Sequence, residues 1–172
     1  MNLKEKIRVI EDFPVKGISF KDITTILTDP EAFDYGISEM IKAFGDVDYD
    51  VIVAPEARGF IIGAPMALRQ HKGFVPIRKP GKLPAETLTF TYELEYGADE
   101  LQVHVDAITP GLKVLVVDDL LATGGTVKAV KDMVQKLGGE VVGMGFLIEL
   151  TGLKAREMLQ GIRVESIVQY EF

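Results

Sequence analysis

The segment Val114–Thr126, VLVVDDLLATGGT, constrains the fold of this chain more than any other. It begins with four apolar residues, Val114–Val117, without polar alternation, which is typical of a strand buried on both faces of a parallel sheet. The apolar residues between Val127 and Leu137 recur at helical spacing, which predicts a helix that begins at Thr126 and ends before Gly138 and Gly139. A buried strand that leads through a tight turn into a helix indicates an α/β fold.

The rest of the chain repeats this alternation. Apolar runs predict strands at residues 51–54, 73–78, 140–148 and 164–168, and helical spacing predicts helices at residues 3–10, 30–44 and 60–70. Asp29 is expected to cap the helix that begins at Pro30. The length of 172 residues suits a single domain, residues 1–172. We therefore expect one α/β domain, a doubly wound parallel sheet with helices on both faces.

One long segment departs from the alternation. Residues 79–106 contain two prolines and two glycines, show no good helical pattern and alternate only weakly in apolar character. A long irregular insertion inside a compact domain is usually functional, so we expect a two-stranded flexible lid there. An ordinary surface hairpin is the alternative.

The residues after the central strand favour a phosphate ligand. Asp118 and Asp119 fall at the carboxyl end of the strand, where open α/β sheets bind their ligands. Residues 122–125 have little side-chain bulk and precede a helix, so their N–H groups can close around an oxyanion. This pattern predicts a ligand with a phosphate and vicinal hydroxyls, such as a phosphorylated ribose, or Mg²⁺ between them. The alternative is a glycine turn whose acidic residues only cap the helix. A second pair, Gly143 and Gly145, lacks the third glycine of a dinucleotide-binding loop and is expected in a strand.

Composition excludes several classes of function. Nineteen basic and 26 acidic residues give a net charge of −7, which disfavours a nucleic-acid partner. The chain has no cysteine, so it has no disulfide or thiol chemistry. The first residues lack a secretory signal pattern, and the longest run without polar side chains, residues 60–68, is too short to span a bilayer. We expect a cytoplasmic protein without membrane contact.

Five segments, in order and spacing, resemble a known family. They are Asp12–Ile23, Glu56–Phe60, Arg78–Pro84, Tyr92–Gly97 and Val116–Thr126. The last resembles the phosphoribosyl-diphosphate signature of the type I phosphoribosyltransferases, and the set is similar to their adenine-specific branch. The resemblance implies a type I phosphoribosyltransferase-like fold with a small N-terminal hood (about residues 1–28), the lid (about residues 79–106), and a homodimer.

It also implies a reaction. Adenine N9 would displace diphosphate from C1 of 5-phosphoribosyl-1-diphosphate and give AMP, with Mg²⁺ held mainly by substrate oxygens and no certain protein ligand. Asp118 and Asp119 would bind the ribose hydroxyls. The 5′-phosphate would lie against Ala122, Thr123, Gly124, Gly125 and Thr126.

The family pattern assigns a second turn and the lid to the diphosphate. Glu56, Ala57 and Arg58 would form a diphosphate turn with a non-proline cis peptide bond between the first two residues. Lys82 would reach the diphosphate from the lid, and Arg78 would reach a neighbouring subunit's site.

The remaining assignments concern the reacting centre and the base. Glu95 and Tyr96 would lie over the reacting centre, where Glu95 could take a proton from the base or stabilise the cationic sugar. Adenine would lie among Ser19, Phe20, Lys21 and Leu150, with the Phe20 ring stacked on the purine. Lys16 stands where proline is common in the family, and Lys21 stands where arginine is common.

Two other functions stay open at this point. One is a phosphoribosyltransferase for another base, such as xanthine, guanine or orotate, although Phe20 and Leu150 offer no donor to a 6-oxo group. The other is a non-catalytic regulator that senses phosphoribosyl diphosphate. The complete lid favours an enzyme over a regulator, and so does the lack of a basic stripe.

Overall fold

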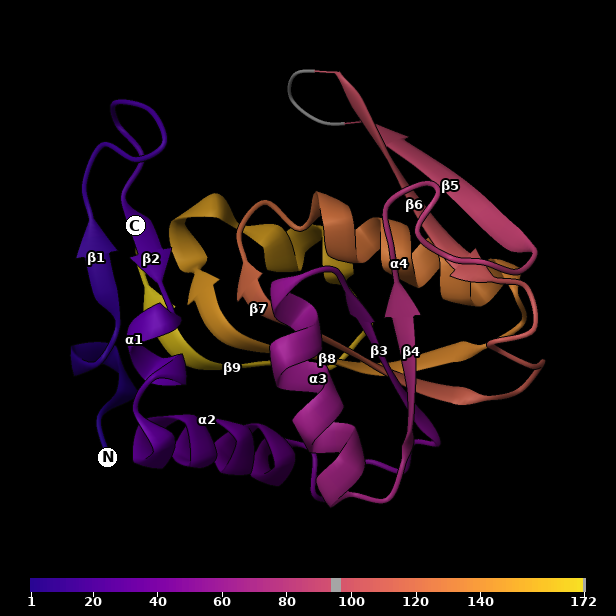
Figure 1. The fold of residues 1–172 in the computed structure, drawn as a ribbon, viewed down its shortest axis with the longest axis horizontal. Helices are drawn as coiled ribbons and strands as arrows, with labels where there is room; N and C mark the ends of the chain where they lie inside the picture. The colour runs from indigo at the N-terminus through magenta and orange to yellow at the C-terminus, as the bar shows by residue number, and fades with distance from the viewer. Residues whose placement is uncertain (94–96, 172) are drawn as a thin grey trace.

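The computed structural model describes residues 1–93 and 97–171, and its centre is a parallel sheet (Figure 1). The sheet has the strand order β4-β3-β7-β8-β9, and every neighbouring pair is parallel. Its strands are β3 (Val51–Pro55), β4 (Gly73–Ile77), β7 (Lys113–Leu121), β8 (Glu140–Leu150) and β9 (Val164–Tyr170). Residues 114–117 are fully buried, as the unbroken apolar run predicts. The predicted α/β class is confirmed.

Helices cover both faces of this sheet. α2 (Pro30–Ala43) and α3 (Arg58–Arg69) pack on one face together with the short α1 (Thr24–Leu27), and α4 (Gly125–Lys136) packs on the other. Asp29 caps α2 as expected, because its carboxylate accepts hydrogen bonds from the N–H groups of Glu31 and Ala32. None of the helices in the described ranges is long and apolar enough to cross a membrane.

The N-terminal residues form a small antiparallel hairpin instead of the predicted helix. Only Leu3–Glu5 are helical, as the 3₁₀ turn η1, and the helix predicted over residues 3–10 is wrong. Strand β1 (Arg8–Ile10) pairs instead with β2 (Phe20–Asp22). A helix this short has little stability of its own, so pairing between the two strands determines the structure here.

The insertion after β4 forms two long antiparallel strands. β5 (Thr87–Glu93) pairs with β6 (Ala98–His104) over its whole length, which confirms the predicted two-stranded form. At the base, the backbones of Arg78 and Gln102 exchange hydrogen bonds of 2.9 and 2.7 Å. In Figure 1 the hairpin rises from the β4 edge of the molecule, and apolar side chains of β5 and β6 pack against the same core as α4.

Strand β7 is longer than predicted, and two glycines of β8 lie at a helix contact. β7 continues through Asp118 and Asp119 to Leu121, so the acidic pair lies inside the strand and not after it, because β8 is long enough to pair with these residues. Gly143 and Gly145 lie within β8, as expected. A Cβ at either glycine would come within 2.9 Å of the Phe44 ring of the α2 C-terminus. These glycines therefore serve helix packing.

Candidate active site

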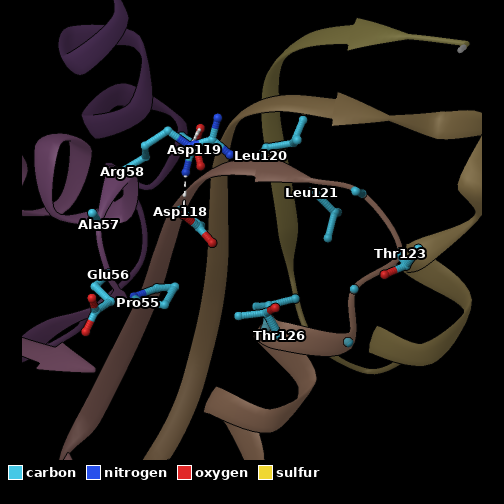
Figure 2. A pocket seen from close by; sticks show the side chains of 14 residues that line it. Pro55, Glu56, Ala57, Arg58, Asp118, Asp119, Leu120, Leu121, Thr123 and Thr126 are labelled. Atoms are coloured by element: carbon cyan, nitrogen blue, oxygen red, sulfur yellow. Dashed lines mark hydrogen bonds and ion pairs between the residues drawn. The ribbon is translucent and has the colours of Figure 1, made fainter. Parts of the chain in front are cut away.

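A cavity of about 250 Å³ lies at the carboxyl ends of β3 and β7 (Figure 2). Two strand–turn–helix units form it: β3 leads into α3, and β7 leads into α4. Both helix N-termini therefore face one cavity. Its lining comprises Pro55, Glu56, Ala57, Arg58, Asp118, Asp119, Leu120, Leu121, Ala122, Thr123, Gly124, Gly125, Thr126 and Val127.

The acidic pair carries an unsatisfied oxygen. Asp119 is 4% exposed, and its Oδ2 lies 3.0 Å from Arg58 Nε, as an ion pair without hydrogen-bond geometry. Within the described part of the chain, this Oδ2 is a buried acceptor that receives no hydrogen bond. Buried acceptors rarely lack a hydrogen bond, because the cost of removing the acceptor from water is then not compensated. A donor from a ligand would satisfy it.

The electrostatics of the two carboxyl groups follow from their burial. Burial raises the pKa of Asp118 well above its ordinary value, and the adjacent Asp119 carboxylate raises it further. Burial also raises the pKa of Asp119, although the Arg58 guanidinium opposes this shift. Asp118 Oδ1 accepts a hydrogen bond of 2.8 Å from the backbone N–H of Asp119, which fixes its orientation (Figure 2).

A glycine in α3 permits this arrangement. A Cβ at Gly59 would lie 2.9 Å from Asp118 Oδ1 and 3.2 Å from Pro55 Cδ. Any larger residue would push the start of α3 away from the acidic pair. We predicted no role for Gly59 from the sequence. Its position at the start of a predicted helix, next to the cavity that contains the acidic pair, could have indicated one.

The glycine turn, residues 122–126, leaves donors free for an anion. Gly124 has a φ of +88° and precedes the first residue of α4. Within the described residues, the first turn of α4 has neither a side-chain cap nor an acidic residue. Its N–H groups therefore keep their hydrogen-bonding capacity and a positive potential, as an anion site requires.

The second turn contains the expected backbone feature. The peptide bond between Glu56 and Ala57 is cis. Glu56 Oε1 accepts hydrogen bonds of 2.6 Å from Lys79 N and 3.3 Å from Arg78 Nε. Glu56 thus joins this turn to the base of the lid. Arg78 lies outside the cavity lining, and so does Lys82, which is exposed.

The residues expected around the base do not belong to the cavity lining. The Arg58 guanidinium lies 5.6 Å from the Phe20 ring centroid, so one side chain contacts both the hood and Asp119. Lys21 is buried, and its Nζ donates to Ser19 Oγ at 2.6 Å and lies 4.7 Å from the Tyr170 ring centroid.

The lysine that stands in place of the arginine common in the family is therefore held between Ser19 of the hood and Tyr170 of β9. Leu150, partly buried, is the register partner of the same Tyr170.

Glu95 and Tyr96 lie outside the described residues. The neighbouring Tyr92 is described: its hydroxyl lies 3.3 Å from Asp99 Oδ2 and 3.5 Å from Thr126 Oγ1. The lid therefore reaches the glycine turn. This contact was missed from the sequence, although Tyr92 belongs to one of the five segments of the family pattern.

The comparisons with known proteins agree with this geometry. The phosphoribosyl transferase domain family matches residues 25–166. The chain is 60% identical to the adenine phosphoribosyltransferase of Alkaliphilus oremlandii over 172 residues, all of both chains. It is also 60% identical to that of Halothermothrix orenii, over 98% of this chain and 99% of the relative.

Solved structures extend the agreement to the fold. The adenine phosphoribosyltransferase of Thermoanaerobacter pseudethanolicus superimposes with a TM-score of 0.95 at 54% identity, over 98% of each chain. The yeast enzyme, from Saccharomyces cerevisiae, was solved with an imino-altritol bisphosphate and adenine; it superimposes with a TM-score of 0.89 at 38% identity, over 96% of each chain. The chain therefore belongs to the phosphoribosyl transferase domain family and, within it, to the adenine phosphoribosyltransferases.

Proposed function

We propose that this chain transfers the 5-phosphoribosyl group from 5-phosphoribosyl-1-diphosphate to adenine in purine salvage, forming AMP and diphosphate. The observation that carries the proposal is the buried Asp119 Oδ2, which accepts no hydrogen bond from the described residues and lies in a cavity between two helix N-termini. A ligand with phosphates for the helices and hydroxyl donors for the acids fits this cavity.

Each part of the phosphoribosyl group has a partner in this proposal. The 5′-phosphate accepts hydrogen bonds from the backbone of the glycine turn, at the start of α4. The ribose hydroxyls donate to Asp118 and Asp119, which removes the unsatisfied acceptor. The acidic pair thereby orients C1 of the ribose for attack.

The diphosphate lies against the N-terminus of α3. We assign it to Glu56, Ala57 and Arg58, with Lys82 joining from the lid and Arg78 serving a neighbouring subunit in a cytoplasmic homodimer. The described residues contain no group of three or more His, Cys, Asp or Glu side chains that could hold a metal ion. Mg²⁺ would be held mainly by substrate oxygens, close to Asp118 and Asp119, whose carboxylates suit the coordination sphere of this ion. Bound Mg²⁺ supplies charge neutralisation on the diphosphate.

The base and the lid complete the proposed site. Adenine stacks on Phe20, is read by the backbone at Ser19 and Lys21, and packs on Leu150. The lid excludes water, which would otherwise compete with the base as nucleophile. We assign Glu95 and Tyr96 to the reacting centre.

A purine panel tests the substrate. We expect AMP when the protein is incubated with phosphoribosyl diphosphate, Mg²⁺ and adenine, and little product from hypoxanthine, guanine or xanthine, as nucleotide chromatography would show. Preference for a 6-oxopurine would establish the alternative transferase. Absence of product with every base, with phosphoribosyl diphosphate bound, would indicate a regulator. The control is the double variant Asp118→Asn, Asp119→Asn, which should stay folded by circular dichroism and lose turnover.

The role of Glu95 has its own test. If the carboxylate takes a proton or stabilises the cationic sugar, Glu95→Gln should lower kcat by about 10²–10⁴, the usual range for one acid–base group. Substrate binding should change much less, because the charge acts mainly in the transition state. Glu93→Gln is the matched control, since Glu93 is an exposed carboxylate of the same lid. A wild-type kcat for Glu95→Gln would limit that residue to covering the site.

A further inference from the structure

An ion pair between a buried glutamate and a partly exposed arginine lies outside the cavity, at the carboxyl end of β8. Glu149 is 3% exposed. Its Oε1 accepts a hydrogen bond of 2.8 Å from Arg156 Nε, and its Oε2 accepts one of 2.7 Å from Arg156 Nη2. Oε2 also accepts a hydrogen bond of 2.6 Å from Ser166 Oγ, in β9. Both oxygens are thus engaged within the protein, so this carboxylate does not serve as a substrate ligand.

The ion pair fixes a short helix to two strands. Arg156 belongs to the 3₁₀ helix η3 (Ala155–Leu159), which follows η2 (Thr151–Leu153). Its Nη1 also donates to the backbone carbonyl of Val164 at 2.8 Å. One guanidinium therefore ties η3 to the end of β8 and to the start of β9. This pair adds little net stability, because burial of Glu149 carries a desolvation cost and the 45% exposed Arg156 side chain is screened by solvent. We therefore expect the ion pair to fix the position of η3 and not to serve mainly for stability.

η3 packs against the glycine turn. A Cβ at Gly124 would lie 3.0 Å from Met158 Sδ and 3.1 Å from Ala155 Cβ. These two side chains therefore lie directly behind the residue whose positive φ starts α4. In Figure 1 the gold segment after β8 lies beside the loop from β7 to α4. The contact path runs from Glu149 through Arg156 and η3 to the glycine turn.

We propose that Glu149 and Arg156 are positioning residues for the phosphate site. Their ion pair holds η3, and η3 holds the glycine turn in the conformation that directs its N–H groups at the 5′-phosphate. A displacement of about 1 Å in such a turn is enough to cost about 10²-fold in rate. The inference rests on the proposed function in one respect, which is that the ligand of the glycine turn is a 5′-phosphate.

The variant Arg156→Gln tests this role against Arg163→Gln as a matched control. Arg163 is also a partly exposed arginine with two short hydrogen bonds to one carboxylate, that of Asp46, but its partners belong to the α2 end and β9. We expect Arg156→Gln to raise the KM for phosphoribosyl diphosphate and the Kd of ribose 5-phosphate at least about tenfold. The KM for adenine should stay within about twofold, and Arg163→Gln should leave all three constants unchanged.

A second variant covers the case in which Arg156→Gln fails to fold. Met158 is 43% exposed, so Met158→Ala leaves the core intact and removes the contact with Gly124. Met158→Ala should raise the KM for phosphoribosyl diphosphate and the Kd of ribose 5-phosphate, by a smaller factor than Arg156→Gln does. Its circular dichroism spectrum should match that of the wild type. Arg156→Lys, which keeps the charge without the two-point contact, should fall between wild type and Arg156→Gln.

Calorimetric titration with ribose 5-phosphate separates this inference from the proposed function. Weaker binding in Arg156→Gln or Met158→Ala supports the inference, even if the wild type formed no AMP. Wild-type affinity in every folded variant of Arg156 and Met158 would overturn it, even if AMP formation were established.

Discussion

Asp118 and Asp119 are consecutive carboxyl residues in a strand that is otherwise apolar after Lys113. The raised pKa of Asp118 means that the folded protein holds this proton more tightly than the unfolded chain does. Its stabilising contribution is therefore present at low pH and is lost as the pH rises from the ordinary value of 3.8 through the raised pKa. The ionised Asp118 carboxylate therefore destabilises the folded protein at neutral pH.

Removal of the charge at Asp118 should reverse this loss. We expect Asp118→Asn to increase the free energy of unfolding at pH 7 by on the order of 1 kcal/mol, with the gain vanishing as the pH falls to about 4. Urea unfolding of variant and wild type at several pH values measures it.

Asp48 provides a control of opposite sign, because the hydrogen bond from Lys113 lowers its pKa. Asp48→Asn should lose stability at neutral pH and none below the lowered pKa. A gain at Asp118 that does not depend on pH would contradict this account.

At the scale of elements, the junction between the glycine turn and α4 combines backbone conformation with packing. Gly124→Ala adds a Cβ at a φ of +88° and within 3.1 Å of Met158 and Ala155. Gly111→Ala meets the same backbone cost, because its φ is +85°, but its Cβ would have no neighbour within 4 Å.

We expect both substitutions to lower the free energy of unfolding by about 1–2 kcal/mol, and Gly124→Ala by more. Gly124→Ala alone should also weaken binding of ribose 5-phosphate, measured by calorimetry. Equal effects of the two substitutions on binding would show that packing behind the turn is unimportant.

Helices and strands are predicted correctly from the sequence where an unbroken apolar run or a clear helix cap marks them. Residues 114–117 lie in a central strand, and α2 begins at Pro30 after Asp29, because local patterns there agree with the fold. Residues 8–10 form a strand instead of the predicted helix because they pair with β2. This pairing could not be predicted from the local pattern, since β2 lies beyond a loop of nine residues, 11–19. The boundary of β7 was misplaced for the same reason, since β8 determines where it ends.

At the scale of the whole molecule, the site forms where segments distant in sequence converge. The two strand–turn–helix units were predicted individually, and the parallel sheet brings both helix N-termini to one cavity. The link between Glu149, Arg156 and Ser166 was not predicted, because it depends on the pairing of β8 with β9 and on the path of η3. With a net charge of −7, the molecule attracts anions only where such local geometry exposes N–H groups and placed cations.

Arg58 gives this arrangement a thermodynamic consequence. Its guanidinium lies against the Phe20 ring and is ion-paired with Asp119, so the side chain contacts the proposed base and ribose subsites at once. A first substrate that shifts Arg58 alters the surroundings that the second substrate meets. Because coupling between two sites is reciprocal, the factor by which phosphoribosyl diphosphate changes the dissociation constant of adenine equals the factor by which adenine changes that of phosphoribosyl diphosphate. Arg58 thus provides a physical route for a coupling free energy that the two binding equilibria share.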